Sequence, residues 1–211
     1  MSLPLMTSPR ISRGKMACAV LVGITLAATL AIAQRAEIEP TKSVITVHVF
    51  KSGLFSSFAH DHVIQAPVAS GGIDVQAKSV TLTFNVADMK VLDPGTSDSE
   101  RKDIDATMKG PKVLDGAQFP TISYSSNSVK ASGADRNEVT GTLKIHGVSR
   151  QITAPVTFHD GKYSGSLALK QTDYGITPVK IAGGTVRVKD EITIEFVVAP
   201  ASANTAHGAS H

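Results

Sequence analysis

The sequence has no tryptophan and a single cysteine, Cys18, which lies within the first 33 residues. From Gln34 onward there is therefore no cysteine that could form a disulfide or serve as a catalytic nucleophile. Stability has to come from a packed core. Roughly 165 residues are enough to bury one in a single domain.

An excess of positive charge is also missing once residues 1–33 are set aside. The whole chain has 21 basic and 18 acidic residues, but Arg10, Arg13 and Lys15 are the only charges of that first segment. The remainder is balanced at 18 of each sign. Nucleic-acid binding requires a concentrated basic surface. We therefore expect no nucleic-acid partner.

Motifs of the common enzyme classes are missing as well. The chain has no G-x-S-x-G nucleophile elbow, no P-loop and no dinucleotide fingerprint. The glycine-rich pieces at 70–72 and 183–184 are interpreted as turns or bulges. Lys102, Asp103 and Asp105 are interpreted as solubilising charges on a helix. We expect no enzyme and no cofactor, and an uncharacterised enzymatic activity stays the weakest of three hypotheses.

Residues 1–33 have the composition of an export signal. Three basic residues precede an uncharged apolar run from Met16 to Ile32, and Ala31-Ile32-Ala33 forms an A-x-A cleavage site. The alternative is an uncleaved membrane anchor, for which a run of 17 residues is short. The pattern favours cleavage before Gln34 and a periplasmic or secreted protein.

The remaining chain alternates between apolar and polar residues with a period of two, which predicts half-buried strands. The residues on the apolar face of each strand are Ile45, Val47 and Val49; Val80, Leu82, Phe84 and Val86; Ile122 and Tyr124; Val139, Leu143 and Ile145; Ile152, Ala154, Val156 and Phe158; Tyr163, Gly165, Leu167 and Leu169; and Ile192, Ile194, Phe196 and Val198. His60 and His62 lie on a further short strand.

One segment, beginning at Asp98, predicts a helix, because Ile104 and Met108 are four residues apart among charged neighbours. Gly110-Pro111 ends it. The pattern predicts an all-β protein, an antiparallel barrel or sandwich of about eight strands with a short helical insertion. Residues 34–200 form this domain, and 201–211 form a disordered tail. An eight-stranded barrel is either just filled or holds one small ligand, and the scarcity of aromatic residues favours a ligand.

The order of several short motifs resembles the YceI-like family of exported bacterial proteins, over roughly Ser43 to Ala199. The matching pieces are Phe58-x-His60, Arg101-Lys102-Asp103, Leu114-Asp115, Phe119-Pro120-Thr121-Ile122, Tyr124-x-Ser126, the segment GTLKIHGV at 141–148, and Asp173-Tyr174-Gly175. The resemblance implies a lipocalin-like antiparallel barrel, capped by the helical insert, that holds a long apolar molecule such as a polyisoprenoid or a fatty-acid derivative.

Under this interpretation the inward side chains contact the ligand, Ile104 and Met108 cover one end, and Tyr124 and His60 donate hydrogen bonds. The expected role of the membrane is only that of a source of lipid. Association into a homodimer is left open. The expected ligand-binding residues are Phe58, His60, Leu82, Phe84, Val86, Ile104, Met108, Ile122, Tyr124, Leu143, Ile145, Ile194 and Phe196.

A departure from the family pattern opens a metal-binding alternative. Many members have one histidine followed by glycine where this chain reads His60-Asp61-His62. Side chains two apart on a strand share a face, so both imidazoles could reach one metal ion, with His48 or His146 as a third ligand. The plainer interpretation is that the pair is exposed or hydrogen-bonded, since H-x-H alone is a weak signal. We therefore expect no bound metal.

The first prediction concerns export. The mature protein is expected to begin at or near Gln34 and to be soluble, because the A-x-A ending matches a cleavage site. Intact-mass measurement on the exported fraction checks this. A mass that retains residues 1–33, found only in membranes, would refute it.

Overall fold

The computed structural model describes residues 35–52, 61–181 and 186–201, all within the compact unit Ala33–His211. Several sequence-based predictions lie outside the described residues. They are the export signal at 1–33, Phe58, His60, the glycines at 183–184 and the tail from 202 onward. Among the residues described, no helix has both the length and the apolar character needed to cross a bilayer.

The described chain consists mainly of strands. They are β1 (Arg35–Glu37), β2 (Val44–Ser52), β3 (His62–Gln65), β4 (Ser70–Asp74), β5 (Ser79–Asn85), β6 (Lys90–Val91), β7 (Thr121–Ala131), β8 (Arg136–Ile145), β9 (Val148–His159), β10 (Lys162–Lys170), β11 (Lys180–Ile181) and β12 (Val186–Val198). The described residues also form one α-helix, α1 (Asp98–Lys109), and three short 3-10 helices, η1 (Pro40–Lys42), η3 (Val86–Asp88) and η4 (Gln171–Tyr174).

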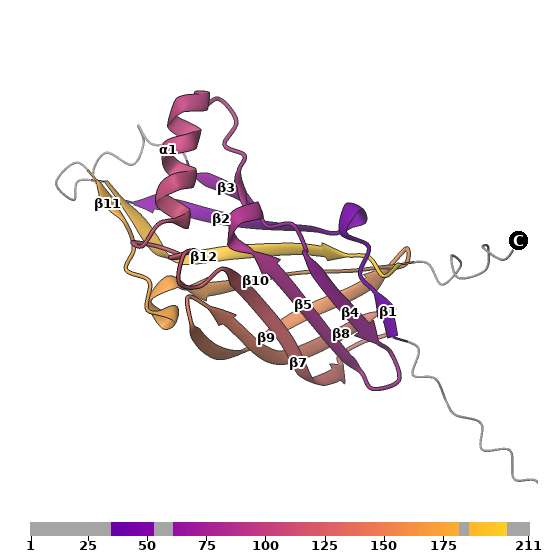
Figure 1. Cartoon of the computed structure of the whole chain (residues 1–211). Coiled ribbons are helices and arrows are strands. Elements are labelled where there is room, and N and C mark those ends of the chain that lie inside the picture. Colours follow the sequence, from indigo (N-terminus) through magenta and orange to yellow (C-terminus); the bar gives the residue numbers. More distant parts are fainter. Residues whose placement is uncertain (1–34, 53–60, 182–185, 202–211) are drawn as a thin grey trace, which may run out of the picture. The chain divides into compact units, whose positions relative to one another are not determined.

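All twelve strands belong to one antiparallel sheet (Figure 1). Its order is β1-β4-β5-β7-β8-β9-β10-β12-β2-β3-β6, and β11 pairs with β12. From β7 to β10 each strand pairs with the next one in the chain, as expected for strands joined by short turns. The prediction of an all-β antiparallel fold with one α-helix is confirmed.

The predicted count of about eight strands is too low, because four short strands, β1, β4, β6 and β11, were not predicted. β1 and β2 are separated by η1, which begins at Pro40, and β3 and β4 are separated by the residues around Pro67. η3 separates β5 from β6 in the same way. Proline has no N–H to donate to a ladder, so it interrupts pairing where it occurs. The strands β1, β4 and β6 beside these interruptions are only three, five and two residues long, too short for a clear period-two signal.

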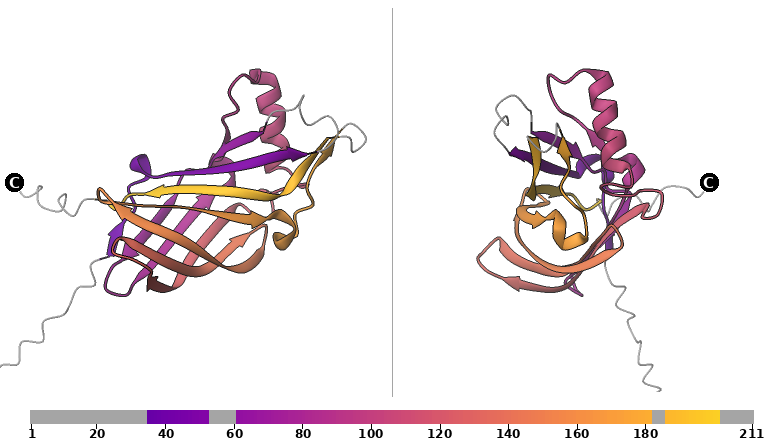
Figure 2. Two further views of the ribbon diagram at one scale, coloured as in Figure 1. Left: turned by 180° about the vertical axis from the view of Figure 1, so that it is seen from behind. Right: turned by 90° about the vertical axis from the view of Figure 1, so that its left-hand side faces the viewer.

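The sheet curls until the two ends of its order meet. The order begins with β1, β4 and β5 and ends with β2, β3 and β6. The chain runs directly from β1 to β2, from β3 to β4 and from β5 to β6, so these two groups of strands are connected to each other. Ile38 forms a bridge with Pro200, and the Glu39 N–H donates to the Ala199 carbonyl at 2.8 Å. Figure 2 shows the strands curving around an interior. This barrel-like arrangement turns one face of most strands inward.

The predicted alternation explains what the inner face contains. In the ladders, Leu82 lies opposite Tyr124 and Tyr124 opposite Leu143, so inward residues of adjacent strands align. Most of the buried residues form one apolar cluster that continues from the strands to Met108 and Leu114 beside α1. The core therefore follows the inner wall of the sheet.

Local sequence signals set the ends of α1. The side chain of Ser97 accepts a hydrogen bond from the Glu100 N–H at 3.3 Å, which caps the first turn. Gly110 and Pro111 end the helix as predicted. Met108 is buried and Ile104 is half-buried. Figure 1 places α1 at the end of the sheet that carries β3.

The interpretation of residues 70–72 as a turn or bulge is wrong. Ser70, Gly71 and Gly72 form the first part of β4, where they lie opposite Thr83, Leu82 and Thr81. Glycine is depleted in strands, so the glycine-rich composition of residues 70–72 did not indicate a strand. The segment is nevertheless paired on both sides. The partner strands β1 and β5 supply that pairing.

The second prediction concerns Gly165, which packs where β9 meets β10. A methyl group added there would meet the Pro155 carbonyl oxygen and the ring of Phe196. Gly165→Ala is therefore expected to lower the free energy of unfolding by roughly 1–3 kcal/mol, the usual cost of overpacking. Urea unfolding measures it.

The matched control is Gly133→Ala, because the nearest heavy atom to an added methyl group at that position is 3.5 Å away. It should change the free energy of unfolding by less than about 0.5 kcal/mol. Equal stability of the two variants would contradict the close approach of β9 to β10 at Gly165.

Candidate functional site

The interior of the sheet contains a cavity of about 490 Å³. Its walls are almost entirely apolar, because the strands turn their Val, Ile and Leu side chains inward. Cavities of roughly 300–1,000 Å³ with such walls are typical of sites for small apolar ligands. The polar residues in the lining are few: Asp74, Lys78, Ser79, Tyr124, Asn137, Tyr163, Lys170, Gln171 and Tyr174.

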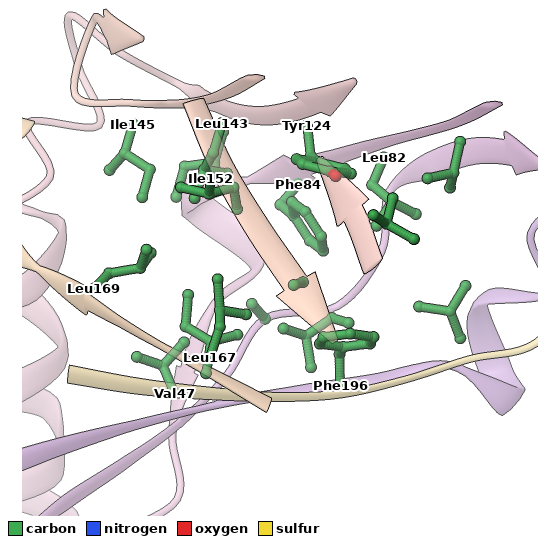
Figure 3. A pocket seen from close by; sticks show the side chains of 18 of the residues that line it. Val47, Leu82, Phe84, Tyr124, Leu143, Ile145, Ile152, Leu167, Leu169 and Phe196 are labelled. Atoms are coloured by element: carbon green, nitrogen blue, oxygen red, sulfur yellow. The ribbon is translucent and has the colours of Figure 1, made fainter. Parts of the chain in front are cut away.

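The ladders bring inward side chains together from opposite walls. On one wall Phe84 lies opposite Ile122, next to the pairing of Leu82 with Tyr124. On another, Ile194 lies opposite both Val47 and Leu167. Figure 3 shows Leu82, Phe84, Tyr124 and Leu143 on one side of the cavity, with Val47, Leu167 and Phe196 on the other.

One end of the cavity is closed by the segment around α1. Met108, Leu114, Tyr174 and Ile176 line the cavity there, and each is at most 8% exposed. The Leu114 N–H donates to the Met108 carbonyl at 3.0 Å, which holds the turn after the helix against the cavity. At the other end the lining reaches the turn between β4 and β5, where Val75 is 65% exposed.

Two tyrosine hydroxyls in the lining have no hydrogen-bond partner within the described part of the chain. They belong to Tyr124 on β7 and Tyr174 in η4, and both oxygen atoms are buried. Burial raises the pKa of Tyr124 to about 12, so this phenol stays protonated near neutral pH. Burial also raises the pKa of Tyr174, with Asp173 raising it further and Arg150 opposing the shift. Both are therefore donors without an acceptor in the described chain, on residues that line the apolar cavity.

A missing side chain on β8 makes room for the Tyr124 hydroxyl. A methyl group on Gly141 would lie 2.6 Å from that oxygen atom. Gly141 is two residues from Leu143, the ladder partner of Tyr124, so the phenol ring extends along β8. Gly141 therefore provides space for the hydroxyl but no hydrogen-bond acceptor.

The structure brings most of the expected ligand-binding residues together. The residues that line the cavity are Leu82, Phe84, Met108, Ile122, Tyr124, Leu143, Ile145, Ile194 and Phe196. Val86 and Ile104 are not in the lining. β5 ends at Asn85 and Val86 begins η3, so the strand alternation no longer applies there, whereas Ile104 packs against the apolar cluster from outside the cavity.

Sequence reasoning did not nominate many other lining residues, although most belong to the same alternating series. They are Ile45, Val47, Val49, Val80, Val139, Ile152, Ala154, Val156, Leu167, Leu169, Ile192 and Val198. The period-two signal was present for each of them. Tyr174 and Ile176 had no such signal, because they follow β10 in and after a 3-10 helix.

His62 has a structural partner that is far away in the sequence. Its Nδ1 lies 2.5 Å from the Oδ2 of Asp93, whose Oδ1 accepts the Val63 N–H at 2.7 Å. Asp93 is 1% exposed. A buried carboxylate needs such partners to offset its lost hydration. The pair joins β3 to the segment that leads from β6 to α1.

The other histidines named for the metal alternative lie apart. His48 points outward from β2, because its neighbours Val47 and Val49 line the cavity, and its Nε2 is 3.4 Å from Glu195. His62 lies opposite Val49 and so faces the other side of the sheet. The structure therefore places His48 and His62 on opposite faces of the sheet.

His146 lies in the turn before β9. It packs against Phe119, and its Nδ1 is 3.3 Å from the Tyr174 carbonyl oxygen. Within the ranges that the structure describes, no three His, Cys, Asp or Glu side chains are grouped closely enough to hold a metal ion. His60 lies outside those ranges.

Comparisons with known proteins add a family and a fold. A sequence model of the YceI-like domain matches residues 37–199. A UPF0312 protein of Pseudomonas syringae pathovar tomato is 32% identical over 132 residues, which are 57% of this chain and 65% of that protein. A UPF0312 protein of Pseudomonas putida is 30% identical over 121 residues, 52% of this chain and 60% of that protein. Each match thus spans less than two thirds of the relative's length.

Among solved structures, that of BcnA from Burkholderia cenocepacia has a similar fold. The TM-score is 0.55 at 21% sequence identity, and the match covers 76% of this chain and 98% of BcnA. The likeness concerns the fold alone.

The third prediction concerns the unpaired hydroxyl of Tyr124. A buried donor without an acceptor destabilises the folded state, so its removal is expected to be neutral or favourable. Tyr124→Phe should raise the free energy of unfolding of the ligand-free protein by up to about 1 kcal/mol. Tyr163→Phe, which alters a half-buried tyrosine whose ring contacts Phe158 at a tilted angle, is the control. A loss of more than about 1 kcal/mol in Tyr124→Phe would mean that the hydroxyl has a partner within the protein.

Proposed function

The chain belongs to the YceI-like domain family, and from this membership and the apolar cavity we propose that it binds one long apolar molecule, such as a polyisoprenoid or a fatty-acid derivative. The observation that carries the proposal is the cavity of about 490 Å³, lined by the inward side chains of most strands. A curled sheet of this kind leaves room for a ligand that a packed sandwich would not.

The energetics of transfer from water support a ligand with a long hydrocarbon part. Each buried methylene contributes roughly 0.8 kcal/mol, so ten to twenty carbons would contribute roughly 8–16 kcal/mol. Association costs at least roughly 4 kcal/mol in lost translational and rotational freedom. Tight binding therefore needs most of the chain to be enclosed, and the continuous apolar lining from the β4–β5 turn to Met108 favours that arrangement.

The two buried tyrosines support a ligand that also carries an oxygen acceptor. Tyr124 and Tyr174 offer phenolic protons inside walls with few other polar groups. A carbonyl, ether or hydroxyl oxygen of the ligand would satisfy one of them and set the ligand's orientation. The charged residues of the lining lie toward its ends, as Lys78 does at the β4–β5 turn.

The N-terminal segment supports a place of action outside the cytoplasm. Residues 1–33 have a basic start, an apolar run and an A-x-A ending, and this pattern supports export to the periplasm or the exterior. There the protein would act as a carrier or store for a molecule that is poorly soluble in water, and the membrane would be the source of that molecule. Binding without chemical conversion is part of the proposal.

The fourth prediction tests the cavity with Leu143→Trp. Leu143 is 6% exposed and lines the cavity from the C-terminal half of β8. A larger ring would occupy space that a ligand needs, so affinity for a long-chain fluorescent fatty acid should fall about tenfold or more. Stability should change by less than about 1 kcal/mol, whereas overpacking of a filled core costs roughly 1–3 kcal/mol. Fluorescence titration and urea unfolding give the two values.

Leu92→Trp is the matched control, because Leu92 is 46% exposed and is not part of the lining. It should leave both affinity and stability close to those of the natural protein. A Leu143→Trp protein that binds the fatty acid as well as the control does would contradict the proposed function.

A further inference from the structure

The wall of the cavity is interrupted between β9 and β10. These strands pair only next to their turn, at Lys162–His159, Tyr163–Phe158 and Ser164–Thr157. Beyond that point residues 148–156 pair with β8 alone and residues 165–170 with β12 alone. We call the space between these two segments the β9–β10 slit. Figure 2 shows the two strands diverging from their shared turn.

Pro155 explains where the pairing ends. The Phe158 N–H donates to the Asp135 carbonyl on the β8 side. Backbone groups alternate in direction along a strand, so Thr157 and Pro155 face β10. Thr157 belongs to the last pair, and Pro155 has no N–H with which to form the next one. The Pro155 carbonyl packs directly against Gly165, and from there the strands separate.

Apolar side chains close the slit where backbone pairing is missing. Ile152 on β9 and Leu167 and Leu169 on β10 line the cavity and also a shallow hollow on the outer surface. Thr153 and Ala168 line that outer hollow only. At this point only side chains, which can change rotamer, separate the cavity from the outer hollow. No ladder of backbone hydrogen bonds joins β9 and β10 there.

We propose that the β9–β10 slit is the passage through which an apolar chain enters and leaves the cavity; this inference rests on the proposed function. Parting any other neighbouring long strands would break a ladder, such as the ten pairs between β8 and β9 or the eight between β10 and β12. Parting the slit breaks no strand ladder: it displaces Ile152, Leu167 and Leu169, and η4, which contacts both β9 and β10, bounds it at one end. The competing passage is the exposed end of the cavity at the β4–β5 turn.

The outer rim of the slit suits a ligand with one polar end. Lys170, Asp173 and Glu191 line the hollow at the end where η4 begins. A head group can remain hydrated among these residues while its hydrocarbon chain slides sideways between the strands. A long molecule that enters sideways in this way does not have to pass lengthwise through the end of the cavity with its whole hydrocarbon chain in water.

The experiment closes the slit and measures exchange. Thr153→Cys and Ala168→Cys are combined in a Cys18→Ser background, which removes the only natural thiol. A short bis-maleimide joins the two thiols on the outer face, and intact mass verifies the product. The probe is cis-parinaric acid, and its uptake and release are followed by stopped-flow fluorescence. Both rates should fall about tenfold or more, with unchanged affinity, because the passage is closed and the cavity is not.

The matched control joins two strands that are already paired. Thr140→Cys and Thr153→Cys lie on β8 and β9, where the two natural hydroxyl oxygens are 2.8 Å apart. This cross-link should leave exchange unchanged. Unchanged exchange in the slit variant, or equal slowing in the control, would overturn the slit as the passage while the proposed function stands. Failure of the natural protein to bind the probe would overturn the proposed function and this inference together.

Discussion

The antiparallel ladder is the constraint on which the rest of this structure depends. Ladder partners share a face of the sheet, so the pairing of Leu82, Tyr124 and Leu143 places three apolar groups side by side inside. The same register continues around the curled sheet to Ile194 and Val47. Most residues of this inner face are Val, Ile or Leu, and together with a few aromatic residues they leave a cavity of about 490 Å³ between the walls.

Interruptions of the ladder are as important as the ladder. Pro40 and Pro67 stand where long strands break and the sheet bends, and Pro155 stands where β9 leaves β10. The His62–Asp93 pair secures the segment between β6 and α1, and so fixes the end of the sheet that Met108 and Leu114 close. Three features together define the walls of the cavity and the end that α1 covers: strand pairing, the places where pairing stops, and the His62–Asp93 contact.

The sequence predicted the all-β class, the antiparallel arrangement, α1 and most of the inner face, because period-two alternation and a Gly-Pro stop are local signals. The family resemblance is confirmed. The strand count was too low because β1, β4, β6 and β11 are short, and the glycines of β4 favoured a turn. Asp93 could not be found, because it meets His62 across 31 positions of the chain. Val86 was misplaced because nothing in its alternation shows that β5 ends one residue earlier.

The central claim is that the cavity holds one long apolar molecule. Native mass spectrometry of the protein, isolated without detergent or organic solvent from the cells that make it, tests this most directly. The account expects a mass greater than that of the chain by one small molecule, which organic solvent then releases as a lipid-like compound. A bare chain mass from every native preparation, with no lipid in the extract, would contradict it.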